Sequence, residues 1–225
     1  MKEFNLSEKS KNYYEENDIY EIFSIAEDKP NKIYECLFSN IKNRIVLDLG
    51  CGTGKFMQKF YMETVKYYGL DLSKEQLKIA KQKVNNENVQ FICCSAENIP
   101  LPDNSVDVII STWVLGTILE IDKRNKVFNE MKRVLKKDGS IYLVENDIGG
   151  EFEEIRNRYP NIKKTKDYND WIENKGFICY KKIETYFEFK DKEEAKNVFT
   201  NIWGEEIGNK VKSQIIRHNV VVYKY

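Results

Sequence analysis

From residue 42 onward, short apolar runs alternate with longer, lysine-rich stretches in which apolar residues recur every three or four positions. Short apolar runs predict buried strands, and the periodic stretches predict amphipathic helices. The alternation of the two predicts βαβ units and a parallel sheet. The predicted strands are 45–49, 67–71, 89–93, 106–111, 141–145, 180–189 and 219–223.

Helices are predicted between and after these strands, with boundaries set by capping signals. Ser73, with Gln76 three residues later, is typical of a helix start, and Gly139 suits a left-handed helix stop. Strand 106–111 is almost entirely apolar, as a strand buried on both faces must be, and is expected to be central. The predicted helices are 56–65, 73–84, 123–135, 151–159, 167–175, 193–203 and 205–217.

The first 41 residues differ from the rest because aromatic residues lie among many charges without a strand pattern. We expect helices that lie over the edge of the sheet, as a helical lid. The predicted organisation is an N-terminal helical lid at 1–41 and one further domain at 42–225. A chain of 225 residues can bury a single core, so no second catalytic domain is expected.

Charge and composition narrow the class of partner. The chain has 36 basic residues (Lys and Arg) and 36 acidic residues (Asp and Glu), so its formal net charge is zero. The net charge therefore does not favour binding to a nucleic-acid backbone or to an anionic membrane. The charged amino terminus does not resemble a signal peptide, and no run of about eighteen apolar residues occurs. We expect a cytoplasmic protein with a small-molecule substrate, as a monomer or homodimer.

The five cysteines are odd in number and form no matching CxxC pairs. Reduced, mostly structural thiols and no metal are therefore expected. The adjacent Cys93 and Cys94 leave open a site for a soft metal or a thiophilic compound.

The chemistry is concentrated where strand 45–49 meets Gly50, Gly52 and Gly54. A sharp turn with a ligand against its backbone needs residues that accept positive φ and carry no side chain. A dinucleotide fingerprint would need its third glycine at Lys55. A phosphate loop would need glycine at Leu49 and a hydroxyl residue at position 56, so both alternatives fail.

The run LDLGCGTG at 47–54 resembles the first motif of class I S-adenosylmethionine (SAM)-dependent methyltransferases. Three further blocks resembling that family follow in order, GLDLS at 69–73, AENIPLPDNSVD at 96–107 and MKRVLKKDG at 131–139. Together they cover roughly 40–147. The resemblance implies an α/β, Rossmann-like, seven-stranded, mostly parallel sheet flanked by helices, and SAM as methyl donor with S-adenosylhomocysteine as product.

The resemblance also implies the residues that hold the cofactor. Asp71 ends a strand about 20 residues after Gly50, where an acid can accept both ribose hydroxyls, although a helix-capping aspartate is the ordinary alternative. The resemblance implies that Asp48 lies beside the sulfonium and amino groups of SAM. The predicted cofactor-binding residues are Asp48, Gly50, Cys51, Gly52, Gly54, Asp71, Leu72, Ser95, Ala96, Glu97 and Ser111.

Two positions depart from the family pattern. Where the family commonly has an aspartate that accepts from the adenine amine, this chain has Ser95, which can bond the base but brings no charge. After the fourth strand the family often has a histidine, and this chain has Gly116. A histidine base at that place is therefore excluded.

The acceptor side has candidates but no motif. Glu145 and Asp147 leave the fifth predicted strand at the edge where parallel sheets bind ligands, and His218 is the only histidine. The alternative for Glu145 and Asp147 is that they are ordinary solvated loop residues, and the alternative for His218 is a structural role. Aromatic candidates for the pocket wall are Tyr13, Tyr14, Trp113 and Trp171. An RNA or protein methyltransferase and a non-catalytic SAM-binding protein remain alternative functions.

Overall fold

The computed structural model describes residues 17–158 and 163–225. These residues form two compact units, one made of 34–144 with 224–225, the other of 17–33 with 145–223. The division into 1–41 and 42–225 stays a prediction. Among the described residues, no helix combines the length and the apolar character needed to cross a membrane.

All seven predicted strands are present, and together they form one sheet in the order β3-β2-β1-β4-β5-β7-β6. The predicted Rossmann-like fold is confirmed, and β4 is central as expected. The strands are β1 (Ile45–Leu49), β2 (Lys66–Asp71), β3 (Val89–Cys93), β4 (Val106–Thr112), β5 (Leu135–Asn146), β6 (Ile178–Glu188) and β7 (Ile215–Lys224).

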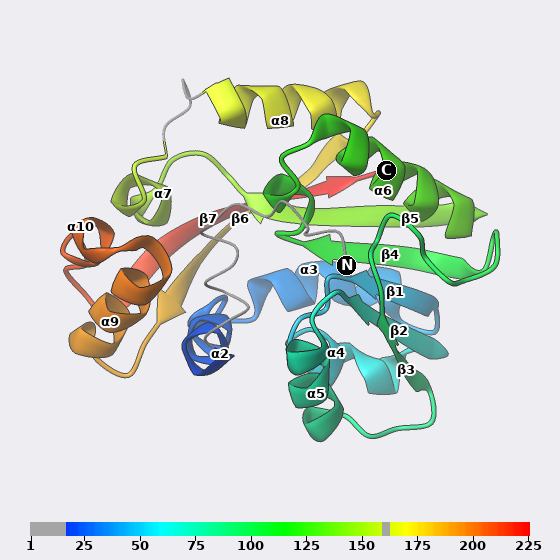
Figure 1. Ribbon diagram of the computed structural model, residues 1–225, viewed down its shortest axis with the longest axis horizontal. Coiled ribbons are helices and arrows are strands. Elements are labelled where there is room, and N and C mark those ends of the chain that lie inside the picture. Colours follow the sequence, from blue (N-terminus) through cyan, green and yellow to red (C-terminus); the bar gives the residue numbers. More distant parts are fainter. Residues whose placement is uncertain (1–16, 159–162) are drawn as a thin grey trace. The chain divides into compact units, whose positions relative to one another are not determined.

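Strands β3, β2, β1, β4 and β5 pair in parallel, which brings their carboxyl ends to one edge of the first unit (Figure 1). Asp48 is opposite Gly69 on β2 and Ile110 on β4. Ile141 and Tyr225 exchange two backbone hydrogen bonds of 3.0 Å, the pattern of an antiparallel pair, so the sheet is mixed.

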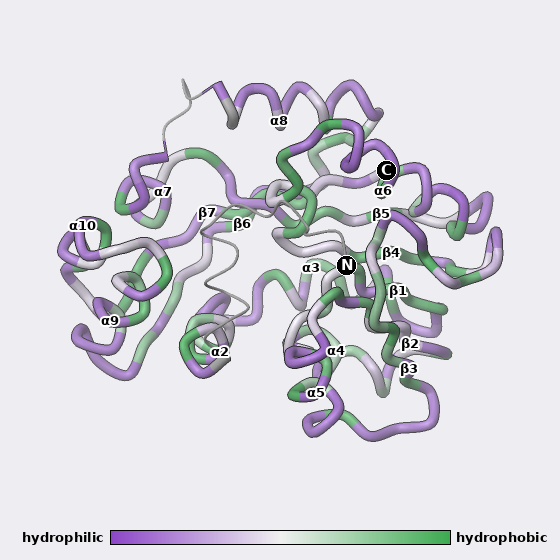
Figure 2. Tube along the Cα trace, in the orientation of Figure 1, coloured by the Kyte–Doolittle hydropathy of each residue, from purple (hydrophilic) through white to green (hydrophobic). Residues whose placement is uncertain are grey.

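The helices cover the apolar strands with amphipathic faces. Helix α5 begins as predicted, because the Ser73 hydroxyl accepts a hydrogen bond from the Gln76 amide. Helix α8 is mostly hydrophilic along its length (Figure 2). The α-helices are α2 (Asn17–Ala26), α3 (Lys32–Ile41), α4 (Met57–Phe60), α5 (Lys74–Lys83), α6 (Ile121–Val134), α7 (Glu151–Ile155), α8 (Lys163–Asn174), α9 (Lys192–Trp203) and α10 (Glu205–Gly208).

Two predicted helices are much shorter in the structure. The helix expected at 56–65 is only α4, followed by the 3-10 turn Tyr61–Glu63. The helix expected at 205–217 ends with α10, and β7 begins at Ile215 instead of residue 219. In the second case strand β7 takes residues 215–217, which the prediction had placed in the helix.

Gly139 is not a left-handed helix stop, and that prediction was wrong. Helix α6 ends at Val134, β5 begins at Leu135, and Gly139 lies inside the strand without a positive φ. The pairing between β4 and β5 shifts here, from Val106 opposite Leu135 to Val108 opposite Ser140. A Cβ on Gly139 would lie 2.6 Å from Leu135 Cδ1 and 2.8 Å from the Asp107 carbonyl oxygen. Glycine is needed for close approach, not for its φ.

The second unit has a core of its own, built mainly from aromatic side chains. Phe187 and Phe199 are fully buried, and the Phe23 ring lies 4.9 Å from that of Phe187. Apolar residues of α2, α7, α9, β6 and β7 complete this core.

We expect Gly139→Ala to lower the free energy of unfolding by about 1–3 kcal/mol, because the added methyl group overpacks against a backbone oxygen that cannot move alone. Denaturant unfolding measures the change. Lys137→Ala is the control, since Lys137 is exposed on the same segment. Equal stability of the two variants would contradict the close-approach argument.

Candidate functional site

The glycine turn after β1 is held by the end of β2. The amides of Gly50 and Cys51 both donate to the Leu70 carbonyl, at 2.7 and 3.0 Å. Gly50 has a φ of +79°, and a Cβ there would lie 2.3 Å from a Val114 methyl carbon. The turn therefore needs glycine both for its backbone angle and for space.

Asp71 ties the turn to the next helix. Its Oδ2 accepts from the Gly52 amide at 2.9 Å, and its Oδ1 accepts from the Ser73 amide at 2.8 Å. Burial raises the pKa of Asp71, and these backbone hydrogen bonds act to lower it. Each carboxylate oxygen has a second lone pair, so two ribose hydroxyls can still be accepted. The capping role and the ribose role are therefore compatible.

Asp48 is the most strongly perturbed acid of the site. Its side chain is 1% exposed, and its Oδ2 accepts a 2.8 Å hydrogen bond from the Tyr67 hydroxyl. Oδ1 is buried and has no hydrogen-bond partner within the described part of the chain. Burial raises the pKa of Asp48 to about 7; the Tyr67 hydrogen bond lowers it and the Asp71 charge raises it. A buried anion without a cation is costly, so this is a place for a positively charged group.

The segment after β3 carries the predicted adenine contacts. Ser95, Ala96 and Glu97 are all half-buried, and the Ser95 hydroxyl accepts from the Glu97 amide at 3.2 Å. Glu97 also lies 3.9 Å from Lys126. Leu72 is exposed at the end of β2, as a residue that packs on a base would be.

The remaining predicted contact, Ser111, is fully buried on β4. Its hydroxyl has no hydrogen-bond partner among residues 17–158 and 163–225. It lies within the packed sheet, one residue after the partner of Asp48 in the register.

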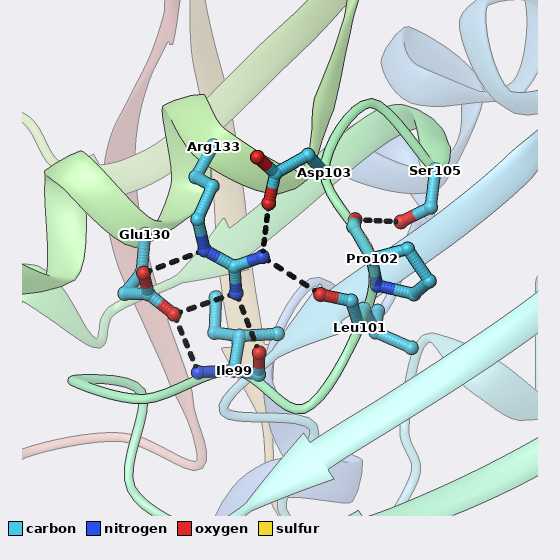
Figure 3. Close-up of polar contacts among 7 residues, drawn as sticks. All are labelled: Ile99, Leu101, Pro102, Asp103, Ser105, Glu130 and Arg133. Atoms are coloured by element: carbon cyan, nitrogen blue, oxygen red, sulfur yellow. Dashed lines mark hydrogen bonds and ion pairs between the residues drawn. The ribbon is translucent and has the colours of Figure 1, made fainter.

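Arg133 on α6 fixes the segment that follows the predicted adenine contacts (Figure 3). Its guanidinium donates to the carbonyls of Ile99 and Leu101 at 2.7 and 2.8 Å, and to Asp103 at 2.8 Å. Glu130 accepts from Arg133 and from the Ile99 amide, each at 2.8 Å. The charged guanidinium of Arg133 therefore fixes the backbone conformation of residues 99–103, beside the candidate site.

Trp113 lies just beyond the carboxyl end of β4 and has a φ of +56°. Positive φ is rare for a bulky residue and is concentrated at functional sites. The Trp113 amide donates to the Val144 carbonyl at 2.9 Å, which holds the turn in place. Lys55 Nζ lies 5.9 Å from the Trp113 ring centroid and 5.7 Å from that of Phe56. A cation and an indole therefore flank the glycine turn.

The acceptor candidates Glu145 and Asp147 are engaged within the second unit. The Tyr168 hydroxyl donates to Glu145 Oε1 at 2.5 Å, and Lys182 pairs with Asp147 at 2.8 Å. Trp171 is 4% exposed and its ring stacks on Tyr168. Tyr13 and Tyr14 lie outside the described residues. A catalytic or pocket role for any of these residues stays a prediction.

His218 is completely buried in the second unit. One ring nitrogen lies 2.8 Å from Asn146 Oδ1, the other 3.8 Å from Glu27, and the ring stacks on Phe187. These contacts are typical of a structural histidine in a core. Within the described ranges no group of three or more histidine, cysteine or acidic residues is arranged to hold a metal.

The sequence interpretation missed Tyr67 and Arg133. Tyr67 is a polar aromatic residue two positions before Gly69, in a strand that the prediction treated only as apolar. Arg133 is one of several basic residues of α6, and its long-range contacts with 99–103 distinguish it from the neighbouring lysines.

The architecture and the glycine turn define a fold class, the Rossmann-like sheet, and solved SAM-dependent methyltransferases have a similar fold. A solved SAM-dependent methyltransferase from Aquifex aeolicus superposes with a TM-score of 0.60 at 19% identity, covering 92% of this chain and 97% of that one. The YcgJ protein of Bacillus subtilis superposes with a TM-score of 0.55 at 18% identity, covering 92% and 97%. These likenesses establish the fold.

The sequence matches agree with the fold. Residues 47–143 match the family model described as a methyltransferase domain. The ubiquinone/menaquinone biosynthesis C-methyltransferase UbiE of Campylobacter jejuni is 29% identical over 63% of this chain and 67% of its own length. The resemblance to class I SAM-dependent methyltransferases, predicted from the motifs, is confirmed.

We expect Arg133→Met to lower the free energy of unfolding by about 1.5–3 kcal/mol, because the Ile99 and Leu101 carbonyls lose a charged donor. Thermal and urea unfolding measure this. Lys132→Met, at the exposed neighbouring position, serves as the control and should change stability little. If the two variants have equal melting temperatures and equal free energies of unfolding, the Arg133 contacts do not stabilise the segment.

Proposed function

We propose that the chain binds SAM at the glycine turn and transfers its methyl group to a small-molecule acceptor. The observation that carries the proposal is the pair of buried carboxylates on either side of the turn. Asp48 offers an oxygen that has no hydrogen-bond partner among the residues that the structure describes, and Asp71 is already fixed by the Gly52 and Ser73 amides.

The charge of the site favours this ligand over nucleotides. A pyrophosphate or triphosphate placed against the glycine turn would meet Asp71, whose carboxylate already occupies the Gly52 amide. Two buried carboxylates repel such anions and favour a cation. SAM carries positive charge at its sulfonium and its amino group, so the residues present fit it.

The roles of the chain's own residues follow from their positions. Bound SAM supplies an already activated methyl group, so alignment of acceptor, methyl and sulfur is the main requirement. Asp48 would hold the amino-acid end and Asp71 the ribose. Ser95, Ala96 and Leu72 would contact the adenine. The Trp113 turn, packed against Gly50 through Val114, would exclude water from the sulfonium side.

A small-molecule acceptor is supported by two independent features. The zero net charge gives no electrostatic reason for binding RNA. The relative UbiE is, by its name, a C-methyltransferase of quinone biosynthesis. Small aromatic compounds are therefore the first class of acceptor to screen.

Isothermal titration calorimetry should detect binding of SAM and S-adenosylhomocysteine, and none of NAD or ATP. The reason is that the Gly52 amide of the turn already donates to the Asp71 carboxylate, which would repel a phosphate. Release of S-adenosylhomocysteine in a metabolite screen then tests transfer. Tight NAD binding without SAM binding would overturn the proposal.

We expect Asp71→Ala to weaken SAM binding about ten- to a hundredfold, the loss of charged hydrogen bonds to the ribose, while Glu97→Ala has a small effect. Calorimetry on both variants gives the comparison. Because Asp71 also holds two backbone amides, circular dichroism must show that the variant is folded, and Asp71→Asn is the milder substitute. Unchanged affinity in a folded Asp71 variant would disprove the ribose role.

A further inference from the structure

Tyr67 and Asp48 form a buried hydrogen-bonded pair between neighbouring strands. Tyr67 is two positions before Gly69 on β2, and Asp48 is opposite Gly69 on β1, so both side chains lie on one face of the sheet. Tyr67 has no exposed surface, and its hydroxyl donates to Asp48 Oδ2 at 2.8 Å. This face is tightly filled, because a Cβ on Gly69 would lie 2.2 Å from Met57 Cε and 3.1 Å from Cys51 Sγ.

Among the described residues, the groups that act on Asp48 carry no positive charge. They are the Tyr67 hydroxyl and the Asp71 carboxylate from β2, and the buried Cys51 thiol from the glycine turn. Burial and Asp71 both disfavour the carboxylate form of Asp48, and within 17–158 and 163–225 only the Tyr67 hydrogen bond favours it. Burial, and to a smaller extent Asp48, raise the pKa of Tyr67 well above its usual value, so the phenol keeps its proton and remains the donor.

The two oxygens of Asp48 therefore differ. Oδ2 is bound by Tyr67, and Oδ1 is buried without a hydrogen-bond partner in the described residues. A phenol that binds one oxygen restricts rotation of the carboxylate and leaves the other as the acceptor for a ligand. This is the arrangement of a preorganised site, in which a supporting residue fixes the group that contacts the ligand.

We propose that Tyr67 is a positioning residue of the cofactor site, which holds Asp48 so that its free oxygen receives the amino group of SAM and which favours the charged form of Asp48. The inference rests on the proposed function, since it requires SAM as the ligand. If Asp48 is protonated when the cationic ligand binds, the carboxyl group releases its proton to solvent. The positive charge of the ligand then balances the carboxylate.

Binding of ligands with the amino-acid end should therefore strengthen as the pH rises through about 7, where Asp48 loses its proton. 5′-Methylthioadenosine has the adenosine and sulfur but no amino-acid end, so its binding should not follow this profile. The ligand's own amino group titrates near pH 8. Comparing variants with the same ligand removes that contribution.

The deciding variant is Tyr67→Phe, with Tyr68→Phe as its matched control. Tyr68 is the next residue on β2, is half-buried, and has Lys66 over its ring. Tyr67→Phe should bind S-adenosylhomocysteine about tenfold more weakly at pH 7, and its pH profile should shift to higher pH because the hydrogen bond that lowers the pKa of Asp48 is lost. Its affinity for 5′-methylthioadenosine should stay unchanged, and Tyr68→Phe should behave as the parent.

Three outcomes overturn the inference. One is an unchanged affinity and pH profile for S-adenosylhomocysteine in Tyr67→Phe. The second is an equal loss of 5′-methylthioadenosine binding, which would make Tyr67 merely structural. The third is a flat profile for the parent protein between about pH 6 and 8, which decides the question even where the variant does not fold. If the parent binds none of the three adenosyl ligands, the proposed function itself fails.

Discussion

The first unit is organised around a buried acid, Asp48, on which none of the described residues acts with a positive charge. The turn after β1 exists because the amides of Gly50 and Cys51 bond the end of β2, and that geometry buries Asp48 next to Asp71. Burial raises the pKa of Asp48 to about 7, so the folded protein prefers this acid in its protonated form. The contribution of Asp48 to stability is therefore fully present below pH 4 or so and is lost as the pH rises through about 7.

Because the folded protein prefers protonated Asp48, ligand binding and folding stability depend on each other. Near neutral pH the unliganded protein bears an unfavourable buried carboxylate, and a cation that binds there removes the penalty. Any ligand that binds only the folded state also stabilises it by mass action. Occupancy of the site and stability of the first unit should thus be strongly coupled at neutral pH and above.

Much of the fold was predictable because strand burial leaves a strong sequence signal. The run 106–111 is apolar because β4 is covered on both faces, and Ser73 with Gln76 marks the start of α5. The glycine turn was equally clear, since three glycines after a strand have few other uses. The predicted ribose acid Asp71 does lie at the turn, through its bond to Gly52.

What the sequence could not reveal depends on contacts between distant residues. Gly139 has the appearance of a helix stop, yet its requirement comes from the Asp107 carbonyl and Leu135 across the shifted strand pair. Tyr67 reads as an ordinary strand residue until its hydroxyl is seen on Asp48. Local patterns specify the elements, whereas these functions arise only when strands are paired.

The backbone of Trp113 has an evolutionary consequence. A tryptophan at a φ of +56° holds a conformation that costs an L-residue roughly 1–2 kcal/mol, and glycine would adopt it freely. Glycine at position 113 would remove this strain, but it would also remove the indole that lies beside Lys55 and the glycine turn. The strained backbone therefore carries an aromatic surface that glycine could not provide. Among related chains, glycine at this position should mark those in which the surroundings of the turn no longer need an aromatic surface.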